Sequence, residues 1–182
     1  MYLNTHSYFS LRYGTCSPEK LAERAAALGI RKMVLTDINN TSASYEFIQA
    51  CRKFDITTAL GIEFRRDHRF LYIGIARNRE GFRELNEFLT RHSLEDTLLP
   101  DVAPRFEHAY IIYRALIKPL EDFADNEFLG VRPEEVNKLF MSPVKDRQDK
   151  MVVLAPVTFQ DDEGFKIHRL LRCIDLNIIL RK

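Results

Sequence analysis

The stretch of sequence that decides the fold reads SPEKLAERAAALGIRKMVLTD, over residues 17–37. Ser17 is a preferred helix N-cap residue, and Pro18 suits the first helical position because its missing N–H would have no partner there. Gly29 is typical of a residue that ends a helix. The apolar run over residues 33–36 is typical of a strand buried on both faces. The stretch therefore predicts a helix followed by a buried parallel strand.

The same alternation extends to both sides of this stretch. Short apolar runs predict strands near residues 1–4, 32–36, 57–62 and 70–76, and helical spacing predicts helices over residues 41–52 and from Asn78 to His92. Strands that alternate with helices form mainly parallel sheets with covering helices, so we expect an α/β fold, built as a barrel or as an open sheet. We also expect a single domain over residues 1–182, with regular β-α units over 1–92 and a less regular closing segment over 93–182.

The closing segment carries strand patterns at residues 109–113 and 151–154 and an amphipathic helix pattern from Phe165 to Ile174. We expect the apolar side chains of this helix to face inward and His168 to lie at its edge; the apolar set is Ile167, Leu170, Leu171 and Ile174. The chain stops at Lys182 without a closing element, which favours a piece of a longer protein.

Composition excludes several classes of protein. Hydrophobic residues make up 46% and charged residues 29% of the chain, so a core can form and disorder is excluded. The 27 basic against 26 acidic residues leave no overall basic field for unspecific binding to nucleic acid or membrane. No apolar run approaches the roughly 20 residues that span a bilayer, and no signal peptide is present. Cys16, Cys51 and Cys173 form no C-x-x-C pair. We therefore expect a cytoplasmic protein without a membrane partner.

Three candidate metal ligands stand at the ends of successive predicted strands. His6 follows the first strand, Asp37 the second, and Glu63 the third. Because the carboxyl ends of parallel strands meet at one edge, these side chains predict a divalent-metal cluster there. Each residue also has a structural interpretation, since the aspartate could cap a helix and the glutamate could pair with Arg65.

Two further features allow a chemical and a structural interpretation. The basic run from Arg65 to Arg69 could contact phosphate, but a solvated hairpin between two strands is the preferred interpretation. Cys16 stands next to a helix start, where a thiol can ionise, but no base is identifiable nearby and a structural role is preferred.

The amino-acid sequence around the candidate ligands is more specific to one family than the spacing of the ligands. Residues 5–14 read THSYFSLRYG, residues 35–37 read LTD, residues 60–63 read LGIE, and residues 72–82 read YIGIARNREGF. Together they resemble the PHP domain (polymerase and histidinol phosphatase), in the version that opens the alpha subunit of bacterial DNA polymerase III. The resemblance implies a distorted β/α barrel, here incomplete, which in active members holds up to three metal ions and hydrolyses phosphoesters.

Only part of the family's ligand set has a matching residue in this sequence. His6 matches the second histidine of the His-x-His motif, Asp37 matches the aspartate of the Asp-His motif, and Glu63 matches the glutamate of Gly-x-Glu. Asn4, at the first position of His-x-His, is a poorer fourth ligand. The resemblance thus implies a weak remnant site for one divalent ion (zinc, manganese or magnesium), or no metal at all.

Other family ligand positions hold residues that do not match the family's ligands. Tyr13 stands where a carboxylate is expected, Ile38 replaces the histidine of Asp-His, and residues 156–159, which end in Phe159, replace the late Asp-x-His motif. A hydrolytic centre with several metals needs more ligands than remain, so we expect no catalytic residues in this chain.

The resemblance implies a DNA replication function. We expect the N-terminal domain of a replicative DNA polymerase III alpha subunit, a nucleotidyltransferase as a whole, in which this piece is an inactive structural and docking domain. Its partners would be the remainder of the alpha chain, a proofreading exonuclease, and DNA through the full-length protein. A free-standing metal-dependent phosphoesterase and a small binding module unrelated to replication are the alternatives.

Overall fold

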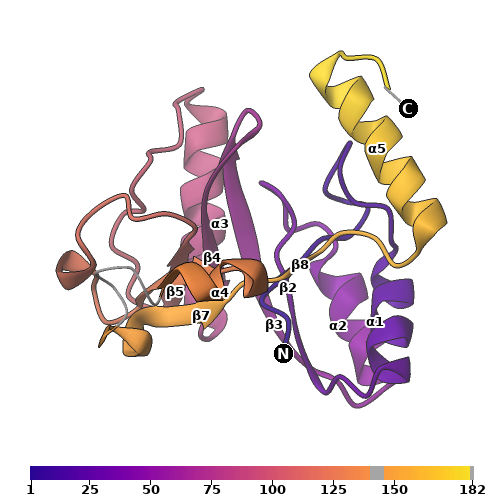
Figure 1. The fold of residues 1–182 in the computed structure, drawn as a ribbon, viewed down its shortest axis with the longest axis horizontal. Helices are drawn as coiled ribbons and strands as arrows, with labels where there is room; N and C mark the ends of the chain where they lie inside the picture. Colours follow the sequence, from indigo (N-terminus) through magenta and orange to yellow (C-terminus); the bar gives the residue numbers. More distant parts are fainter. Residues whose placement is uncertain (140–145, 181–182) are drawn as a thin grey trace. The chain divides into compact units, whose positions relative to one another are not determined.

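The structure is a computed structural model that describes residues 1–139 and 146–180 (Figure 1). The chain forms two compact units, one of Met1–Leu60 with Pro156–Lys182 and one of Gly61–Ala155. The boundary falls inside one strand, β3 (Thr57–Arg66). The single domain expected over residues 1–182 stays a prediction, and residues 140–145 and 181–182 of its closing segment lie outside the described residues.

The first unit is built from parallel strands and three helices. In chain order its elements are β1 (Asn4–Thr5), α1 (Pro18–Ala27), β2 (Lys32–Leu35), α2 (Ser44–Arg52), the first part of β3, β8 (Pro156–Val157) and α5 (Asp162–Leu176). β1 pairs with β8, and β2 pairs with β3, both in parallel. The Thr36 amide donates to the Thr5 carbonyl oxygen over 2.9 Å, which places β1 beside β2.

The second unit contains all the remaining described strands. Its elements are the rest of β3, β4 (Arg69–Ala76), α3 (Arg79–Leu94), β5 (Ala109–Tyr113), the 3-10 turn η1 (Leu120–Asp122), β6 (Glu127–Val131), η2 (Pro133–Glu135), α4 (Val136–Leu139), η4 (Gln148–Lys150) and β7 (Met151–Val153). The strand order is β3-β4-β5-β6-β7. β5, β6 and β7 run parallel to one another, whereas β4 is antiparallel to both of its neighbours.

These pairings confirm the predicted α/β class with mainly parallel strands, with one local correction. The continuous β-α alternation expected up to His92 is wrong between β3 and β4, which form an antiparallel hairpin. Only Asp67 and His68 separate the two strands, and so short a link cannot make the crossover that parallel strands require. Asp67 adopts a φ of 55°, in the left-handed region that a tight turn uses. The preferred interpretation of the Arg65–Arg69 run as a hairpin is confirmed.

Helix starts follow the local sequence signals closely. Ser17 caps α1, its side chain accepting a hydrogen bond from the Lys20 amide, and Pro18 begins the helix as predicted. Asn78 caps α3 in the same way by accepting from the Gly81 amide over 3.0 Å. These caps satisfy amide groups that have no partner within the helix, so the chain itself fixes where each helix begins.

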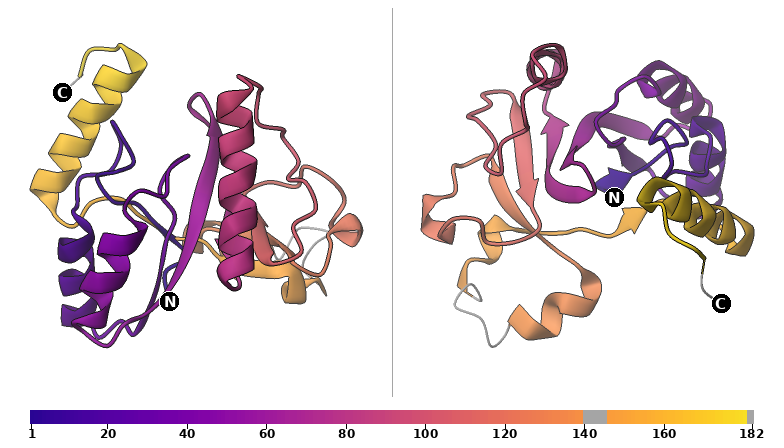
Figure 2. Two further views of the ribbon diagram at one scale, coloured as in Figure 1. Left: turned by 180° about the vertical axis from the view of Figure 1, so that it is seen from behind. Right: turned by 90° about the horizontal axis from the view of Figure 1, so that it is seen from above.

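The predicted inward side of α5 is only partly buried: Leu171 is half-buried, but the other three apolar residues of the predicted set are exposed. Ile167, Leu170 and Ile174 are 42%, 50% and 65% exposed, whereas the predicted edge residue His168 is half-buried against Tyr13. Figure 2 shows α5, in yellow, standing apart from the α1–α2 pair. The apolar period predicted the helix correctly, but it cannot say which face a neighbour will cover. Among residues 1–139 and 146–180, no helix is both long and apolar enough to cross a membrane.

Candidate functional site

Two of the three predicted ligands lie where the sequence placed them, directly after neighbouring strands. His6 follows β1 and Asp37 follows β2, and β1 and β2 are hydrogen-bonded neighbours within the first unit. The prediction that Glu63 stands at the end of the third strand is wrong, because β3 continues past it. The strand continues to Arg66, since antiparallel pairing with β4 sets Glu63 opposite Ile73. Glu63 therefore lies within a strand of the second unit rather than in a loop.

The carboxylate of Asp37 is buried and holds the loop after β1. One oxygen, Oδ1, accepts hydrogen bonds from the Ser7 amide at 2.7 Å and from Ser10 Oγ at 2.6 Å. The other oxygen, Oδ2, accepts from Ser7 Oγ at 2.7 Å. Ser10 Oγ in turn accepts from the Ile38 amide at 3.0 Å. Hydrogen bonds to an ionised acceptor are the stronger kind, so this network fixes the loop against the end of β2.

The imidazole of His6 is enclosed by polar side chains from three chain segments. Asn4 Nδ2 lies 3.3 Å from His6 Nε2 and also donates to Thr36 Oγ1 at 3.1 Å. His6 Nδ1 lies 3.2 Å from Thr158 Oγ1, just after β8. Both ring nitrogens of His6 therefore lie within hydrogen-bonding distance of a protein side chain.

Rings of Tyr13, Phe159, Phe165, His6 and His168 form a contiguous group, here called the aromatic cluster. The Tyr13 ring lies edge-on to His6 at 5.2 Å and to His168 at 4.8 Å. Phe159 lies 5.7 Å from the His168 ring. His168 Nδ1 donates to the Tyr13 carbonyl oxygen over 2.7 Å. Tyr13 and Phe159 thus use their rings to pack α5 and the segment after β8 around His6.

Glu63 has the structural partner that the sequence allowed. Its side chain is buried and forms an ion pair with Nε of Arg65, two residues along the same strand. The Arg65 guanidinium is thus the charged partner of this carboxylate within the second unit.

Together these contacts do not fit a hydrolytic centre with several metals. Within the part of the chain that the structure describes, no three His, Cys, Asp or Glu side chains form a group that could hold a metal ion. Both oxygens of Asp37 accept protein donors, and the rings of Tyr13 and Phe159 offer no ligand where the family resemblance implies one.

Several residues of this region were not predicted from the sequence. Ser7 and Ser10 hold Asp37, Thr158 contacts His6, and His168 completes the aromatic cluster. The two serines could have been found, because hydroxyl side chains in the loop after a strand are natural partners for a neighbouring carboxylate. Thr158 and His168 lie about 150 residues further along the chain than the residues they contact, His6 and Tyr13. No local signal in the sequence links them to the first strand.

The thiol considered for reactivity is structural. Cys16 is buried in the core of the first unit beside α1. Burial raises the pKa of its thiol, with the nearby Asp161 adding to the effect. A thiol so placed stays protonated near neutral pH, which agrees with the preferred structural interpretation.

Comparison with known proteins identifies the family. The PHP domain model matches residues 3–124, more than half of the chain. The chain belongs to the PHP domain family. Its fold of parallel strands with covering helices agrees with that membership.

Relatives of the chain are much longer polymerases. An error-prone DNA polymerase of Mycolicibacterium paratuberculosis is 36% identical over 61 residues, covering 34% of this chain and 6% of the relative. The DNA polymerase III subunit alpha of Buchnera aphidicola is 25% identical over 97 residues, covering 50% of this chain and 8% of the relative. The matched regions thus span under a tenth of the length of these relatives. Among solved structures, an amidohydrolase from Chromobacterium violaceum gives a TM-score of 0.40 at 22% identity, covering 52% of this chain and 34% of that one.

Proposed function

We propose that this chain is the PHP domain of a bacterial DNA polymerase III alpha-type chain, and that it serves there as a structural and docking domain instead of a hydrolase. The PHP match and the polymerase relatives support the first part. The second part rests on the chemistry of the residues at the ligand positions. In this proposal the two compact units together make one PHP-like domain.

The aromatic cluster is the single observation that best supports the proposed loss of hydrolytic activity. Metal-dependent hydrolysis of a phosphoester needs a metal-bound hydroxide and a cation on the phosphate oxygens. Tyr13 and Phe159 instead bring apolar rings to these positions and pack against His6 and His168. Rings in contact at about 5 Å are an ordinary stabilising arrangement in a protein core. The region therefore gains packing where an enzyme would keep charged ligands.

We further propose that His6, Asp37 and Glu63, with Asn4 as a poorer fourth, are the remnant of the family's ligand set. One divalent ion, bound weakly if at all, is the most that such a remnant would hold. The contacts of Asp37 with Ser7 and Ser10 support a present role in organising the loop.

The partners in this proposal follow from the polymerase relatives. The remainder of the alpha chain would pack against the domain, a proofreading exonuclease would dock on it, and DNA would be reached through the full-length cytoplasmic protein. A free-standing phosphoesterase is the competing proposal, and it requires ligands at the positions of Tyr13, Ile38 and Phe159 that this chain does not have.

Activity and metal content test the proposal together. We expect purified protein to release nitrophenol from p-nitrophenyl phosphate and from its diester only at the background rate, with manganese, zinc or magnesium added. We expect residues 1–182 alone to give no primer extension on a defined template, since any polymerase chemistry would lie elsewhere in the chain. Elemental analysis after dialysis should find less than one metal ion per chain.

The contrary outcome is equally concrete. Metal-dependent hydrolysis that is abolished both by Asp37→Ala and by Glu63→Gln would establish a minimal active site and overturn the proposal. Glu63→Gln is included because Asp37→Ala removes a carboxylate that holds a loop, and loss of activity in that variant alone could reflect loss of folding.

A further inference from the structure

Two arginines stand at the carboxyl ends of neighbouring parallel strands in the second unit. Arg114 directly follows β5, Arg132 directly follows β6, and the two strands pair in parallel. A Cβ on Gly130 would lie 2.8 Å from the side chain of Ile112, so these two residues face the same side of the sheet. Side chains alternate along extended backbone, and Arg132 is still extended. Arg114 and Arg132, each two residues further along, therefore share that side.

One carboxylate lies between the two arginines. Glu135 Oε1 accepts from Arg114 Nη2 at 3.3 Å, and Glu135 Oε2 accepts from the backbone amide of Arg132 at 3.0 Å. The neighbouring Glu134 is 67% exposed and lies 3.9 Å from Arg132 Nη1, and an ion pair so exposed contributes little. Two cationic side chains thus lie at one edge of the sheet with a single carboxylate hydrogen-bonded between them.

Buried nitrogen atoms of both arginines lack a partner. Among residues 1–139 and 146–180, Nε of Arg114 and Nε of Arg132 are buried and make no hydrogen bond. A buried donor without an acceptor destabilises the fold, so these atoms point to an acceptor from outside the chain. A water molecule would accept such a hydrogen bond but carries no charge, whereas an anion would also neutralise the two cations. The side chains are 27% and 41% exposed, which leaves the rest of each guanidinium within reach of a ligand.

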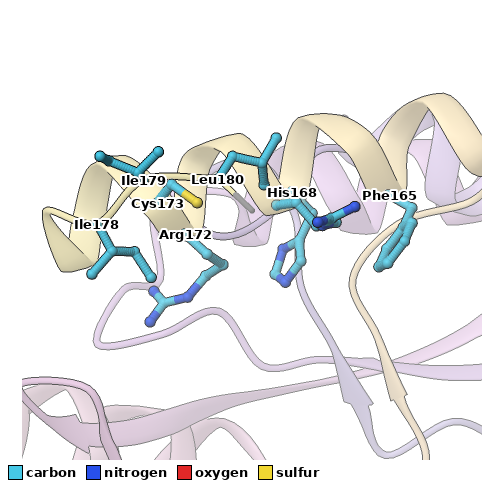
Figure 3. Close-up of a pocket in the computed structure, with 8 residues that line it drawn as sticks. Phe165, His168, Arg172, Cys173, Ile178, Ile179 and Leu180 are labelled. Carbon is cyan, nitrogen blue, oxygen red and sulfur yellow. The ribbon is translucent and has the colours of Figure 1, made fainter. Parts of the chain in front are cut away.

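Other arginines of the chain show what a satisfied guanidinium looks like. Arg66 donates to the carbonyl oxygen of Leu99 at 3.1 Å and to Asp101 Oδ1 at 2.7 Å. Arg172, which extends from α5 in Figure 3, donates to Asp175. The pair at the strand ends differs from these in having Nε atoms that are both buried and without a partner in the described part of the chain.

We propose that Arg114 and Arg132 bind the phosphate group of a phosphate monoester, without a metal ion and without hydrolysing it. The planar fork of a guanidinium matches two phosphate oxygens side by side. A monoester group carries about two negative charges near neutral pH and offers three strong acceptor oxygens, which suits two such forks. A diester in a nucleic-acid backbone carries a single charge. The carboxyl ends of parallel strands are also where ligands bind in α/β sheets.

Glu135 is the internal competitor for this site. Its Oε1 contacts one donor of Arg114 at 3.3 Å, a long hydrogen bond, and its side chain is 37% exposed. A phosphate group between the arginines would repel this carboxylate, which would keep its contact with the amide of Arg132. Removal of the charge of Glu135 should therefore strengthen phosphate binding. The site lies within the second unit alone and does not depend on the proposed polymerase context.

Isothermal titration calorimetry of the 182-residue chain tests the site with inorganic phosphate and with a nucleoside monophosphate. At constant ionic strength we expect one saturable site per chain, with the same affinity in excess EDTA. Arg114→Gln and, separately, Arg132→Gln should each weaken binding about tenfold, since each removes hydrogen bonds to a charged group. Arg91→Gln is the matched control: Arg91 is exposed in the last turn of α3, and its substitution should leave the affinity unchanged.

A gain in affinity provides a test that misfolding cannot imitate. Glu135→Gln should strengthen phosphate binding about threefold, the effect of removing one partly exposed competing charge. Glu95→Gln is its control, because Glu95 is an exposed acid that directly follows α3. Circular dichroism should give the same spectrum for all variants.

Four results would each overturn the inference. No saturable binding of phosphate would remove the site. Unchanged affinity in both Arg114→Gln and Arg132→Gln would place the phosphate elsewhere on the chain. Binding that EDTA abolishes would assign the phosphate to a metal ion. Displacement of phosphate by an oligonucleotide without a terminal phosphate, as effective as displacement by the nucleoside monophosphate, would assign the site to a diester backbone.

Discussion

Asp37 shows at the scale of one residue how a buried carboxylate holds a loop. Its carboxylate accepts from the Ser7 amide, Ser7 Oγ and Ser10 Oγ. Asp37→Asn would turn an N–H₂ group toward these donors, so we expect the free energy of unfolding to fall by about 2 to 3 kcal/mol, as for lost hydrogen bonds to a charged group. Urea denaturation followed by circular dichroism measures this difference.

Asp67→Asn is the control for this change. Asp67 is exposed in the β3–β4 turn with a φ of 55°, a conformation that asparagine adopts as readily. Its substitution should alter the free energy of unfolding by less than about 0.5 kcal/mol. Equal stability of Asp37→Asn and the unaltered protein would show that the loop does not depend on the carboxylate.

Glu127 gives the second unit a defined dependence on pH. Burial alone would raise the pKa of this carboxyl, but hydrogen bonds from Lys118 Nζ, the Ala124 amide and Tyr113 Oη outweigh burial and hold the pKa below its ordinary value. A carboxyl with a lowered pKa contributes stability above its unfolded pKa and loses that contribution as the pH falls through the folded pKa.

We therefore expect the free energy of unfolding to fall as the pH drops below the ordinary carboxyl value of 4.5. Glu127→Gln should cost about 2 to 3 kcal/mol at pH 7 and should flatten this part of the pH profile. Chemical denaturation between pH 3 and pH 7 tests both points. An unchanged slope in the variant would assign the acid sensitivity to other carboxyls.

At the scale of elements, α3 depends on the absence of a side chain in its first turn. A Cβ at Gly81 would lie 1.9 Å from the His108 carbonyl oxygen, which precedes β5. Alanine favours a helix by up to about 1 kcal/mol over glycine. We nevertheless expect Gly81→Ala to lose about 1 to 3 kcal/mol, because backbone cannot yield as a flexible side chain can. Thermal unfolding measures the loss, and Glu87→Ala on the exposed side of α3 should be nearly neutral.

Because α5 leaves part of its apolar side exposed, alanine substitution of a leucine on α5 should cost less stability than the same substitution in the core. Leu170 is half-exposed on α5, whereas Leu85 on α3 is fully buried. In the 182-residue chain, Leu170→Ala should cost less than about 1 kcal/mol, while Leu85→Ala should cost about 2 to 5 kcal/mol through the cavity it leaves. Equal losses for the two variants in urea denaturation would mean that α5 turns its apolar stripe inward after all.

At the scale of the whole molecule, metal ions should have little effect on stability. A ligand present at 1,000 times its dissociation constant stabilises the folded state by about 4 kcal/mol. In a protein of this size each kcal/mol moves Tm by about 2 to 4 °C. If only a weak remnant remains, 1 mM manganese or zinc and excess EDTA should both leave Tm within about 2 °C. A rise of about 10 °C with metal would instead indicate a complete site.

The local elements could be predicted because neighbouring residues specify them. Ser17 and Asn78 cap their helices through amides only three residues away, and short apolar runs mark the strands that follow. The placement of His6 and Asp37 followed from the parallel pairing of the strands before them. Glu63 was wrongly predicted to stand at a strand end. Antiparallel pairing with β4 extends β3 beyond Glu63, and the length of a strand depends on such pairing.

The sequence by itself determined the α/β class and the helix starts, because both depend on residue type and near neighbours. Only the tertiary structure decided how Asp37 is satisfied, which rings surround His6, and which side of α5 remains exposed. These features join residues up to about 150 positions apart in the chain. A periodic pattern defines a face, but the identity of the covering neighbour depends on long-range packing.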